Sequence, residues 1–457
     1  MPGSGYPILA LTLATVAAIG LLAAPDCCAR DTADAAGGGL PEGTFGPLPP
    51  VLGGAPALRV ALWITGLPGE PELYREMMRD FQRTTPDVQI VPAMQSWQED
   101  TQQVIFHELR AETDPADVVL LRDEWLPQAA DELLSLDTAV GSIVRRGYRD
   151  PVLDACRVDG VLRALPFCAR TKCLFYRPAL LHKLHLDPPR TWDELPAVAQ
   201  KLTAEPGVWG FGLPGAPSPD GADILLVMLW AQGGRLVDDE GRLVVGQELL
   251  KALQLCVDLV HVAHATQPET CYWTQESLEN QFLAGKLGML IAGPHLARHL
   301  AMRRPKMDYA VAPLPEWQTR ATRLSVDCLA VSARSPHPEL ALRFLRHATQ
   351  DRYSAAMWRL GLVAAKTSAG RDGGSRGSSG LGTFVTSLEH ARPAPARLWP
   401  HVWPYLADVL VEALTGRRSP EAALVDLLPP DIPSIVHLDK PAAEAEEETS
   451  EASPSEP

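Results

Sequence analysis

The stretch LRVALWITGLPG, residues 58–69, decides the fold of this chain. Its first seven residues form a short apolar run that predicts a buried strand, and its last five have the composition of a turn. Beyond the turn, Leu73, Met77 and Phe81 recur at every fourth position, which indicates an amphipathic helix. A buried strand is therefore followed directly by a helix that can cover it.

The alternation of strand and helix continues beyond this helix. The Thr85-Pro86 pair stops the first helix, because the residue before a proline disfavours the helical conformation. Strands and helices are then predicted in turn at residues 88–91, 97–111, 117–121 and 125–134. Such an order predicts an α/β fold with a mostly parallel sheet covered on both faces.

The second half of the chain carries local signals for the ends of its elements. Thr191–Glu194 has the spacing of a capping box, Gly285 follows a helical pattern, and Ser419-Pro420 fits an N-cap with a first-turn proline. Residues 289–292 and 309–312 predict further strands. The α/β pattern therefore extends over most of the chain.

Composition limits the class of protein. The chain has 457 residues and 46% hydrophobic content, so it can bury one or more sizeable cores. Its 41 Lys+Arg against 56 Asp+Glu give a net charge of −15, which speaks against a nucleic-acid binder. Residues 428–457 hold eight of these acids and one lysine, and we expect them to form a disordered acidic tail.

The N-terminus is typical of a targeting segment and not of a buried core helix. Residues 1–25 contain no charged side chain, and within them Ile8–Ala24 is apolar or small throughout. This run is intermediate in length between a signal-peptide core and a spanning helix, so residues 1–25 predict an export signal or an N-terminal anchor. Residues 26–56 read as a linker. Lipidation of Cys27 or Cys28 in that linker is left open.

The six remaining cysteines lack CxxC spacing, so neither a zinc ribbon nor a thioredoxin-like site is indicated. In an oxidising compartment Cys168–Cys173 or Cys256–Cys271 would close short disulfide loops. Buried free thiols are the alternative for each pair.

Ten segments, taken in order, resemble the family 1 extracellular solute-binding proteins of bacterial ABC sugar importers, the class that includes the maltose-binding type. The segments are residues 58–63, 81–86, 115–119, 159–167, 174–177, 188–195, 232–234, 282–289, 293–294 and 335–341. The resemblance spans about residues 57–427. It implies a type II periplasmic-binding-protein fold, in which two discontinuous α/β lobes are joined by hinge strands and hold the ligand in a cleft between them.

The resemblance also implies where the lobes divide. Lobe one is expected to comprise residues 57–167 with 293–327, and lobe two residues 168–292 with 328–427. The chain then crosses between lobes near residues 168–170, 292–293 and 327–328. Such a cleft collects its residues from many separate loops.

The function that the resemblance implies is capture of an oligosaccharide or sugar derivative and its delivery to ABC permease subunits. The chain is then an exported monomer without catalytic activity, cofactor, metal or nucleic-acid partner. It would be periplasmic or anchored to the outer face of the cytoplasmic membrane.

A sugar presents hydroxyls to polar side chains and a CH-rich face to aromatic rings, so both kinds of residue are candidates for its site. The predicted ligand-binding residues are Trp63, Asp123, Glu124, Arg170, Trp230, His295 and Trp403.

The aromatic candidates come from strand ends and from family spacing. Trp63 ends the first strand, where ligands of open parallel sheets collect, but a core position is the alternative. The spacing from Trp403 to Gly416 matches that of a stacking tryptophan in the maltose-type proteins. The alternative is that Trp403 packs between helices. For Trp230 the sequence leaves open whether the side chain lies in the core or in the cleft.

The polar candidates depart in part from the family pattern. Asp123 and Glu124 follow the third strand, where related sugar binders place carboxylates, although acids at a helix start are also favoured by its dipole. Arg170 stands where maltose-type relatives have a glutamate, and His295 stands where many relatives have a stacking tryptophan. These two departures leave the identity of the sugar open. They also leave open the alternative that the chain is a receptor of the same fold that binds a non-sugar ligand or serves a sensor.

An enzyme is the remaining alternative. The sequence lacks a GxxxxGK[ST] loop, a GxSxG elbow and an HExxH motif. Cys168 or Cys173 with a distant histidine would be needed for a thiol enzyme. Three histidine pairs have helical chelating spacing but no third ligand nearby, which favours surface helices over a metal site: His182/His185, His261/His264 and His295/His299.

Overall fold

The structure is a computed structural model that describes residues 56–98, 100–141, 145–304, 306–368 and 380–438. The predicted export signal or anchor at residues 1–25 and nearly all of the linker at 26–56 lie outside these residues. No helix within the described part is long and apolar enough to cross a membrane.

The first sheet is built around the stretch at residues 58–69. Its strands follow the order β13-β6-β12-β3-β1-β2, and β14 pairs with β12. The bounds are β1 Ala57–Ile64, β2 Gln89–Ser96, β3 Val118–Arg122, β6 Ala164–Arg170, β12 Thr322–Val331, β13 Val363–Ala364 and β14 Ala391–Pro393. The strands β1, β2 and β3 are parallel, as predicted, whereas β12 runs antiparallel to β3 and β6. The sheet is therefore mixed.

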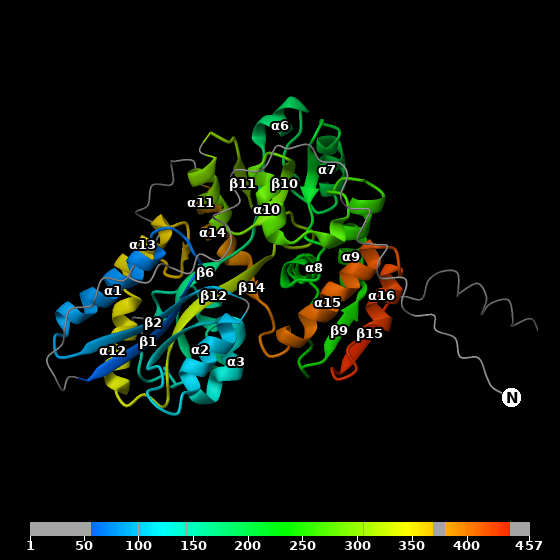
Figure 1. The fold of residues 1–457 in the computed structure, drawn as a ribbon. Helices are drawn as coiled ribbons and strands as arrows, with labels where there is room; N and C mark the ends of the chain where they lie inside the picture. The colour runs from blue at the N-terminus through cyan, green and yellow to red at the C-terminus, as the bar shows by residue number, and fades with distance from the viewer. Residues whose placement is uncertain (1–55, 99, 142–144, 305, 369–379, 439–457) are drawn as a thin grey trace, which may run out of the picture. The chain divides into compact units, whose positions relative to one another are not determined.

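The helices that cover this sheet follow from the sequence pattern. Helix α1 (Glu70–Thr84) buries Leu73, Met77 and Phe81, as their spacing predicts. Gly69 has φ 93°, a conformation that only glycine adopts freely, which lets the chain turn from β1 into α1. Helix α1 packs with α12 (Pro338–Ala348) and α13 (Asp351–Arg359), and α2 (Thr101–Arg110) packs on β1 and β3 (Figure 1).

A second sheet has the strand order β11-β7-β10-β8. Its bounds are β7 Cys173–Tyr176, β8 Trp209–Gly212, β10 Leu287–Ala292 and β11 Ala310–Ala312. Helix α8 (Pro219–Ala231) is buried on nearly every side in a core that it shares with α9 (Gln247–His261) and α15 (Trp399–Leu414). The first core surrounds the first sheet and extends to β7 and β10, where it takes Phe175 and Leu290, whereas the second core takes Leu174 and Met289 from the same two strands.

The remaining elements are shorter or peripheral. They are α3 (Leu126–Ala129), α5 (Asp150–Asp154), β4 (Arg157–Val158), β5 (Val161–Leu162), α6 (Pro178–Lys183), α7 (Leu195–Thr203), β9 (Leu243–Gly246), α10 (Gln275–Leu283), α11 (Pro294–Arg303), α14 (Leu381–Ser387), α16 (Pro420–Asp426), β15 (Ser434–His437) and the 3-10 turns η1 (Asp123–Trp125), η2 (Ala130–Glu132), η3 (Thr270–Tyr272) and η4 (Leu388–His390).

The predicted ends of elements are present where local chemistry specifies them. Thr191 Oγ1 accepts a hydrogen bond from Glu194 N, and the Glu194 carboxylate accepts from Thr191 N, which is the reciprocal pattern of a capping box. Gly285 has φ 78° after α10. Ser419 accepts from Ala422 N at the start of α16.

The two sheets divide the chain differently from the predicted lobe boundaries. Strand β11, which falls in the range expected for lobe one, pairs with β7 in the second sheet. Strand β12 continues through the predicted crossing at 327–328 and stays in the first sheet, followed by α12 and α13 on the same sheet. The reason is that β12 is one strand of 10 residues paired on both edges. Its register with β6 shifts between Asp327 and Cys328, but the strand continues in the first sheet on both sides of that shift.

The expectation of a disordered tail from residue 428 is wrong for its first part. Strand β15 pairs in parallel with β9, and Ile432 and Leu438 pack against the second core. β-Branched and apolar residues in this short segment outweigh its acidic surroundings. Residues 439–457 lie outside the described residues.

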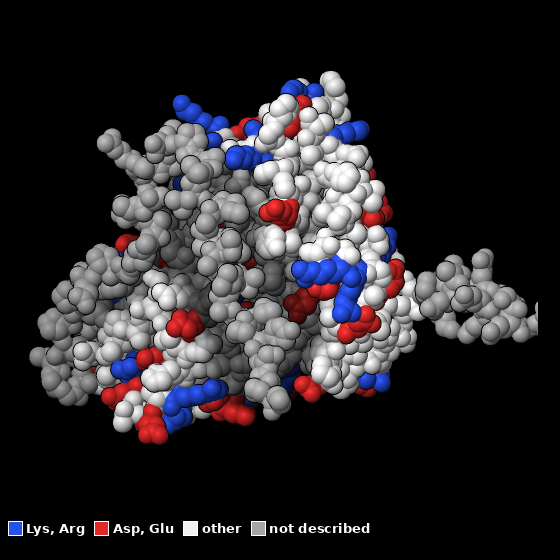
Figure 2. All heavy atoms as spheres, turned by 45° about the vertical axis from the view of Figure 1, so that its right-hand side comes forward, with Lys and Arg blue, Asp and Glu red and all other residues white. Residues whose placement is uncertain are grey.

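The six cysteines described in the structure are free, and all but Cys271 are buried. The alternative of free thiols therefore holds for both pairs that the sequence left open. On the face drawn in Figure 2, basic and acidic side chains are interspersed, a distribution that favours solubility.

Candidate functional site

A cleft with a volume of about 930 Å³ is lined by residues at the edge of the first sheet and by the N-terminal ends of helices that follow it in the chain. On one side lie the ends of β2 and β3. On the other side lie the N-terminal turns of α8, α11 and α15. The floor comes from residues 170–172, which lead from β6 to β7, and from residues 323–325 near the start of β12.

The carboxyl ends of the parallel strands carry one wall of the cleft. Trp97 follows β2 and Arg122 ends β3, so the strand register brings them to the same edge. The Arg122 guanidinium lies 4.1 Å from the Trp97 ring centre, and Trp97 stacks on Trp125 with ring centres 5.7 Å apart. This wall is a flat aromatic surface with a cation over it.

A second aromatic pair lies on the opposite wall. Trp399 and Trp403 are one helical turn apart at the start of α15, and both line the cleft. Trp399 is buried, whereas Trp403 is partly exposed. Rings on both walls can therefore contact the apolar faces of one ligand.

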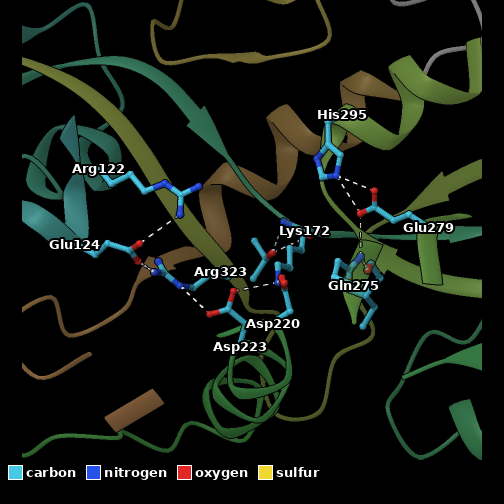
Figure 3. Close-up of polar contacts among 11 residues, drawn as sticks. Arg122, Glu124, Lys172, Asp220, Asp223, Gln275, Glu279, His295 and Arg323 are labelled. Carbon is cyan, nitrogen blue, oxygen red and sulfur yellow. Dashed lines mark hydrogen bonds and ion pairs between the residues drawn. The ribbon is translucent and has the colours of Figure 1, made fainter. Parts of the chain in front are cut away.

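Arg323 joins the two sides by ion pairs (Figure 3). Its Nη2 lies 3.1 Å from Glu124 Oε2, and its Nε lies 3.2 Å from Asp223 Oδ1 on α8. The guanidinium carbon also lies 5.6 Å from the Trp399 ring centre. Burial opposes the charge of Arg323, but the surrounding carboxylates, with Asp223 contributing most, raise the pKa of the guanidinium.

Lys172 holds the first turn of α8. Its Nζ lies 2.8 Å from Asp220 Oδ1 and 3.0 Å from Asp223 Oδ2. Burial alone would lower the pKa of the lysine, but the two carboxylates outweigh it and raise that pKa. Burial likewise opposes the charge of Asp220, yet the Lys172 ammonium lowers the pKa of that carboxyl. Both partners therefore stay ionised.

Arg170 is neutralised by Asp327 on β12. The distance from Arg170 Nη2 to Asp327 Oδ1 is 2.5 Å, and the Cys168 thiol donates to Asp327 Oδ2 at 3.0 Å. Burial raises the pKa of that thiol, and so does the Asp327 carboxylate, while the Arg170 charge opposes the rise. The arginine faces the cleft with its charge already compensated.

A third polar group lies at the start of α11. His295 Nε2 lies 2.9 Å from Glu279 Oε1, and Gln275 Nε2 donates to the same oxygen at 3.0 Å. Although burial opposes ionisation of Glu279, His295 and Gln275 lower the pKa of its carboxyl. The three side chains reach the cleft from α10 and α11 (Figure 3).

Comparison with known proteins shows to which family the chain belongs. The model of the bacterial extracellular solute-binding protein family matches residues 76–374. The chain belongs to this family. Its cleft is therefore the cleft of a solute-binding protein.

Individual relatives agree with this assignment. A putative binding protein of Brucella abortus (strain 2308) is 25% identical over 365 residues, which cover 77% of this chain and 87% of that protein. A probable ABC transporter-binding protein of Deinococcus radiodurans is 26% identical over 255 residues, covering 53% and 60%. Maltose-bound MalE3 of T. maritima superposes with a TM-score of 0.70 at 24% identity, covering 81% of this chain and 98% of that one. The two-lobed fold predicted from the sequence is thereby confirmed.

Four of the seven predicted ligand-binding residues line the cleft of this solute-binding protein. They are Glu124, Arg170, His295 and Trp403. The structure brings them to one site from four separate elements. Their role in binding stays a prediction.

The other three predicted residues lie behind the cleft or away from it. Trp63 is 1% exposed, donates to Leu120 O at 3.2 Å, and supports Trp97 from below with ring centres 4.9 Å apart. Trp230 is buried in the second core, because α8 is enclosed on nearly every side.

Asp123 is also buried, and its carboxylate accepts a hydrogen bond from Val326 N at 2.9 Å. Burial raises the pKa of Asp123 to about 6, opposed by Arg323 and reinforced by Glu124. Its role here is to join β3 to β12, beneath the cleft.

The cleft residues that were not predicted differ in how well the sequence could have indicated them. Arg122 directly follows the predicted strand at residues 117–121, so the rule that ligands collect at strand ends could have found it. Trp97 was predicted to begin the helix at residues 97–111, and it lies at a strand end because β2 continues to Ser96, beyond the predicted end at residue 91. Lys172 and Arg323 gave no such signal, because their partners are distant in sequence. Asp220 resembles an ordinary acid of a first helical turn, and Asp223 lies just beyond that turn.

Proposed function

We propose that this solute-binding protein captures a carbohydrate in the cleft and delivers it to the permease of an ABC importer. The observation that carries the proposal is the pair of aromatic walls, Trp97 with Trp125 and Trp399 with Trp403, around charge-compensated polar groups. A sugar needs such rings for its CH faces and polar groups for its hydroxyls.

The charges of the cleft support a ligand without net charge. Arg170 is paired with Asp327, and Arg323 with Glu124 and Asp223. An anionic ligand would have to displace one of these carboxylates, at the cost of leaving it unpaired. MalE3 of T. maritima is bound to maltose, and the relative from Deinococcus is a probable ABC transporter-binding protein, which agrees with both parts of the proposal.

The mechanism of capture is closure of two lobes on the ligand. A ligand that contacts both aromatic walls binds the closed state better than the open state and therefore favours closure. The proposed hinge lies at residues 170–172, which lead from β6 to β7, and at residues 322–325 at the start of β12, where Thr322 Oγ1 donates to Lys172 O at 2.7 Å.

The proposed setting is outside the cytoplasm. The extracellular solute-binding family implies export, and the apolar run at Ile8–Ala24 would serve as signal or anchor. The protein would act as a non-enzymatic monomer, periplasmic or held at the outer face of the cytoplasmic membrane, and permease subunits would be its partners.

A thermal-shift screen of the full chain tests the proposal, with maltose, longer maltodextrins, monosaccharides, amino acids and anions as probes. A ligand that binds only the folded state raises the melting temperature by mass action. We expect a rise with a neutral sugar. A rise only with amino acids or anions would contradict the carbohydrate proposal and favour a receptor of the same fold for another solute or for a sensor.

A further inference from the structure

The N-terminal part of α8 presents two acids to the cleft, and the protein supplies its own cation to them. Asp220 and Asp223 both line the cleft, and Lys172 Nζ lies between them at 2.8 and 3.0 Å (Figure 3). The lysine comes from the segment between β6 and β7, on the floor of the site.

The three side chains differ in how far they reach the solvent. The side chain of Asp220 is 38% exposed, that of Asp223 13% and that of Lys172 18%. Asp220 is therefore the most accessible of the three from the cleft, and the lysine holds its Oδ1.

We infer that Lys172 is a specificity-determining residue: its ammonium makes the acid pair of α8 accept uncharged hydroxyl groups and exclude ligand amines. The inference rests on the proposed function, because it names the class of carbohydrate that the cleft takes. A hydroxyl donates a hydrogen bond to Asp220 without adding charge. An amine would place a second cation beside Lys172, where like charges repel each other and lower affinity.

Lys172 is the main cation beside Asp220. In the part of the chain that the structure describes, the ion pair with Lys172 is the one that Asp220 makes, while the charges of His295 and Arg122 act on the carboxyl more weakly and lower its pKa in the same direction. Arg323 is paired with Asp223 and Glu124. Removing the lysine would therefore leave Asp220 in the cleft without an ion-pair partner.

The test uses the full chain and its Lys172→Met variant, which keeps the length of the side chain and removes the charge. Thermal shifts are measured with maltose, glucosamine and putrescine, against sodium chloride at matched ionic strength. The unaltered protein is expected to show no shift with either amine, whereas Lys172→Met gains affinity for them by about tenfold or more. A folded Lys172→Met variant without this gain would overturn the inference.

A matched control is available on α6, away from the cleft. Lys183 Nζ lies 2.5 Å from Glu205 Oε2, and the lysine side chain is 63% exposed. Lys183→Met removes the lysine of this ion pair, and the variant has the same total charge as Lys172→Met. An equal gain in amine affinity by this control would assign the effect to net charge and overturn the inference.

A conservative variant and chemical rescue keep the inference testable where Lys172→Met does not fold. Lys172→Arg retains a cation and is expected to fold and to exclude amines. Refolding of Lys172→Met is expected to recover with methylammonium chloride and not with sodium chloride, since the small cation replaces the lost group. Failure of methylammonium to recover it while Lys172→Arg folds would refute the role. Failure of the unaltered protein to bind any sugar is a separate result, which refutes the proposed function.

Discussion

Replacing Asp123 by asparagine is expected to stabilise the protein above about pH 6 and to change little in acid. The carboxyl group is buried, and its oxygen accepts a hydrogen bond from Val326 N at 2.9 Å. Arg323 favours its ionisation but is shared with Glu124 and Asp223, so burial prevails. An asparagine can accept the same hydrogen bond without burying a charge.

The sign follows from the direction of the pKa shift. The pKa of Asp123 rises from 3.8 to about 6, so the folded state holds the proton more tightly than the unfolded chain does. Its contribution to stability is complete below about pH 4 and is lost as the pH rises through about 6. A shift of about 2 pKa units, at about 1.4 kcal/mol each, sets an upper limit near 3 kcal/mol at neutral pH.

Urea unfolding of the full chain between acidic and neutral pH checks this expectation. The free energy of unfolding of Asp123→Asn, relative to the unaltered protein, should rise by about 2–3 kcal/mol between pH 4 and pH 7.5. The exposed Asp87 supplies the control, since Asp87→Asn should give no comparable rise. A difference that does not vary with pH, or a variant destabilised at pH 7.5, would refute the reasoning.

Three further outcomes are expected. Trp403→Ala should weaken sugar affinity at least about tenfold with little change in melting temperature, because Trp403 lines the cleft; calorimetry that finds unchanged affinity removes it from the site. Arg323→Met should cost about 3 kcal/mol or more in urea unfolding, because Glu124 and Asp223 lose a buried cation, and an unchanged transition would contradict that role. Ser419→Ala should cost about 1 kcal/mol through loss of the cap of α16, whereas Ser419→Gly, measured in the same melts, should cost less.

Much of the fold could be predicted because its signals are local. The run that became β1, the glycine turn at Gly69 and the spacing of the α1 core residues all lie within one short stretch. The capping box at Thr191–Glu194 and the stop at Gly285 also depend only on near neighbours. In such segments propensity, pattern and capping all favour the same structure.

The errors in the fold arose where pairing is non-local. Strand β12 takes its place from β3 and β6, which lie far earlier in the chain, so nothing within residues 322–331 marks the sheet to which they belong. Strand β15 was obscured by composition, because the acids around it dominate any average over residues 428–457. A four-residue strand that pairs at a distance leaves almost no signal in such an average.

In the site, too, some side-chain positions could be predicted from the sequence and others depend on contacts between distant parts of the chain. The resemblance to the family predicted that Glu124, Arg170, His295 and Trp403 lie at the cleft, and the structure places them there, at the ends of a strand and of helical segments. Whether an aromatic residue at a strand end faces the ligand or the core depends on the pleat and on the neighbouring strand, and here Trp97 takes the surface while Trp63 lies beneath it.

The ionic contacts depend on assembly of the whole fold. Lys172 meets Asp220 from 48 residues away, and Arg323 meets Glu124 from 199 residues away. Neither lysine nor arginine is unusual in its own sequence context; each becomes informative only once the sheets place an acid beside it. The residues that we infer to select the ligand are therefore those whose chemistry the sequence alone conceals, because specificity in this cleft depends on which charges are already compensated before the ligand arrives.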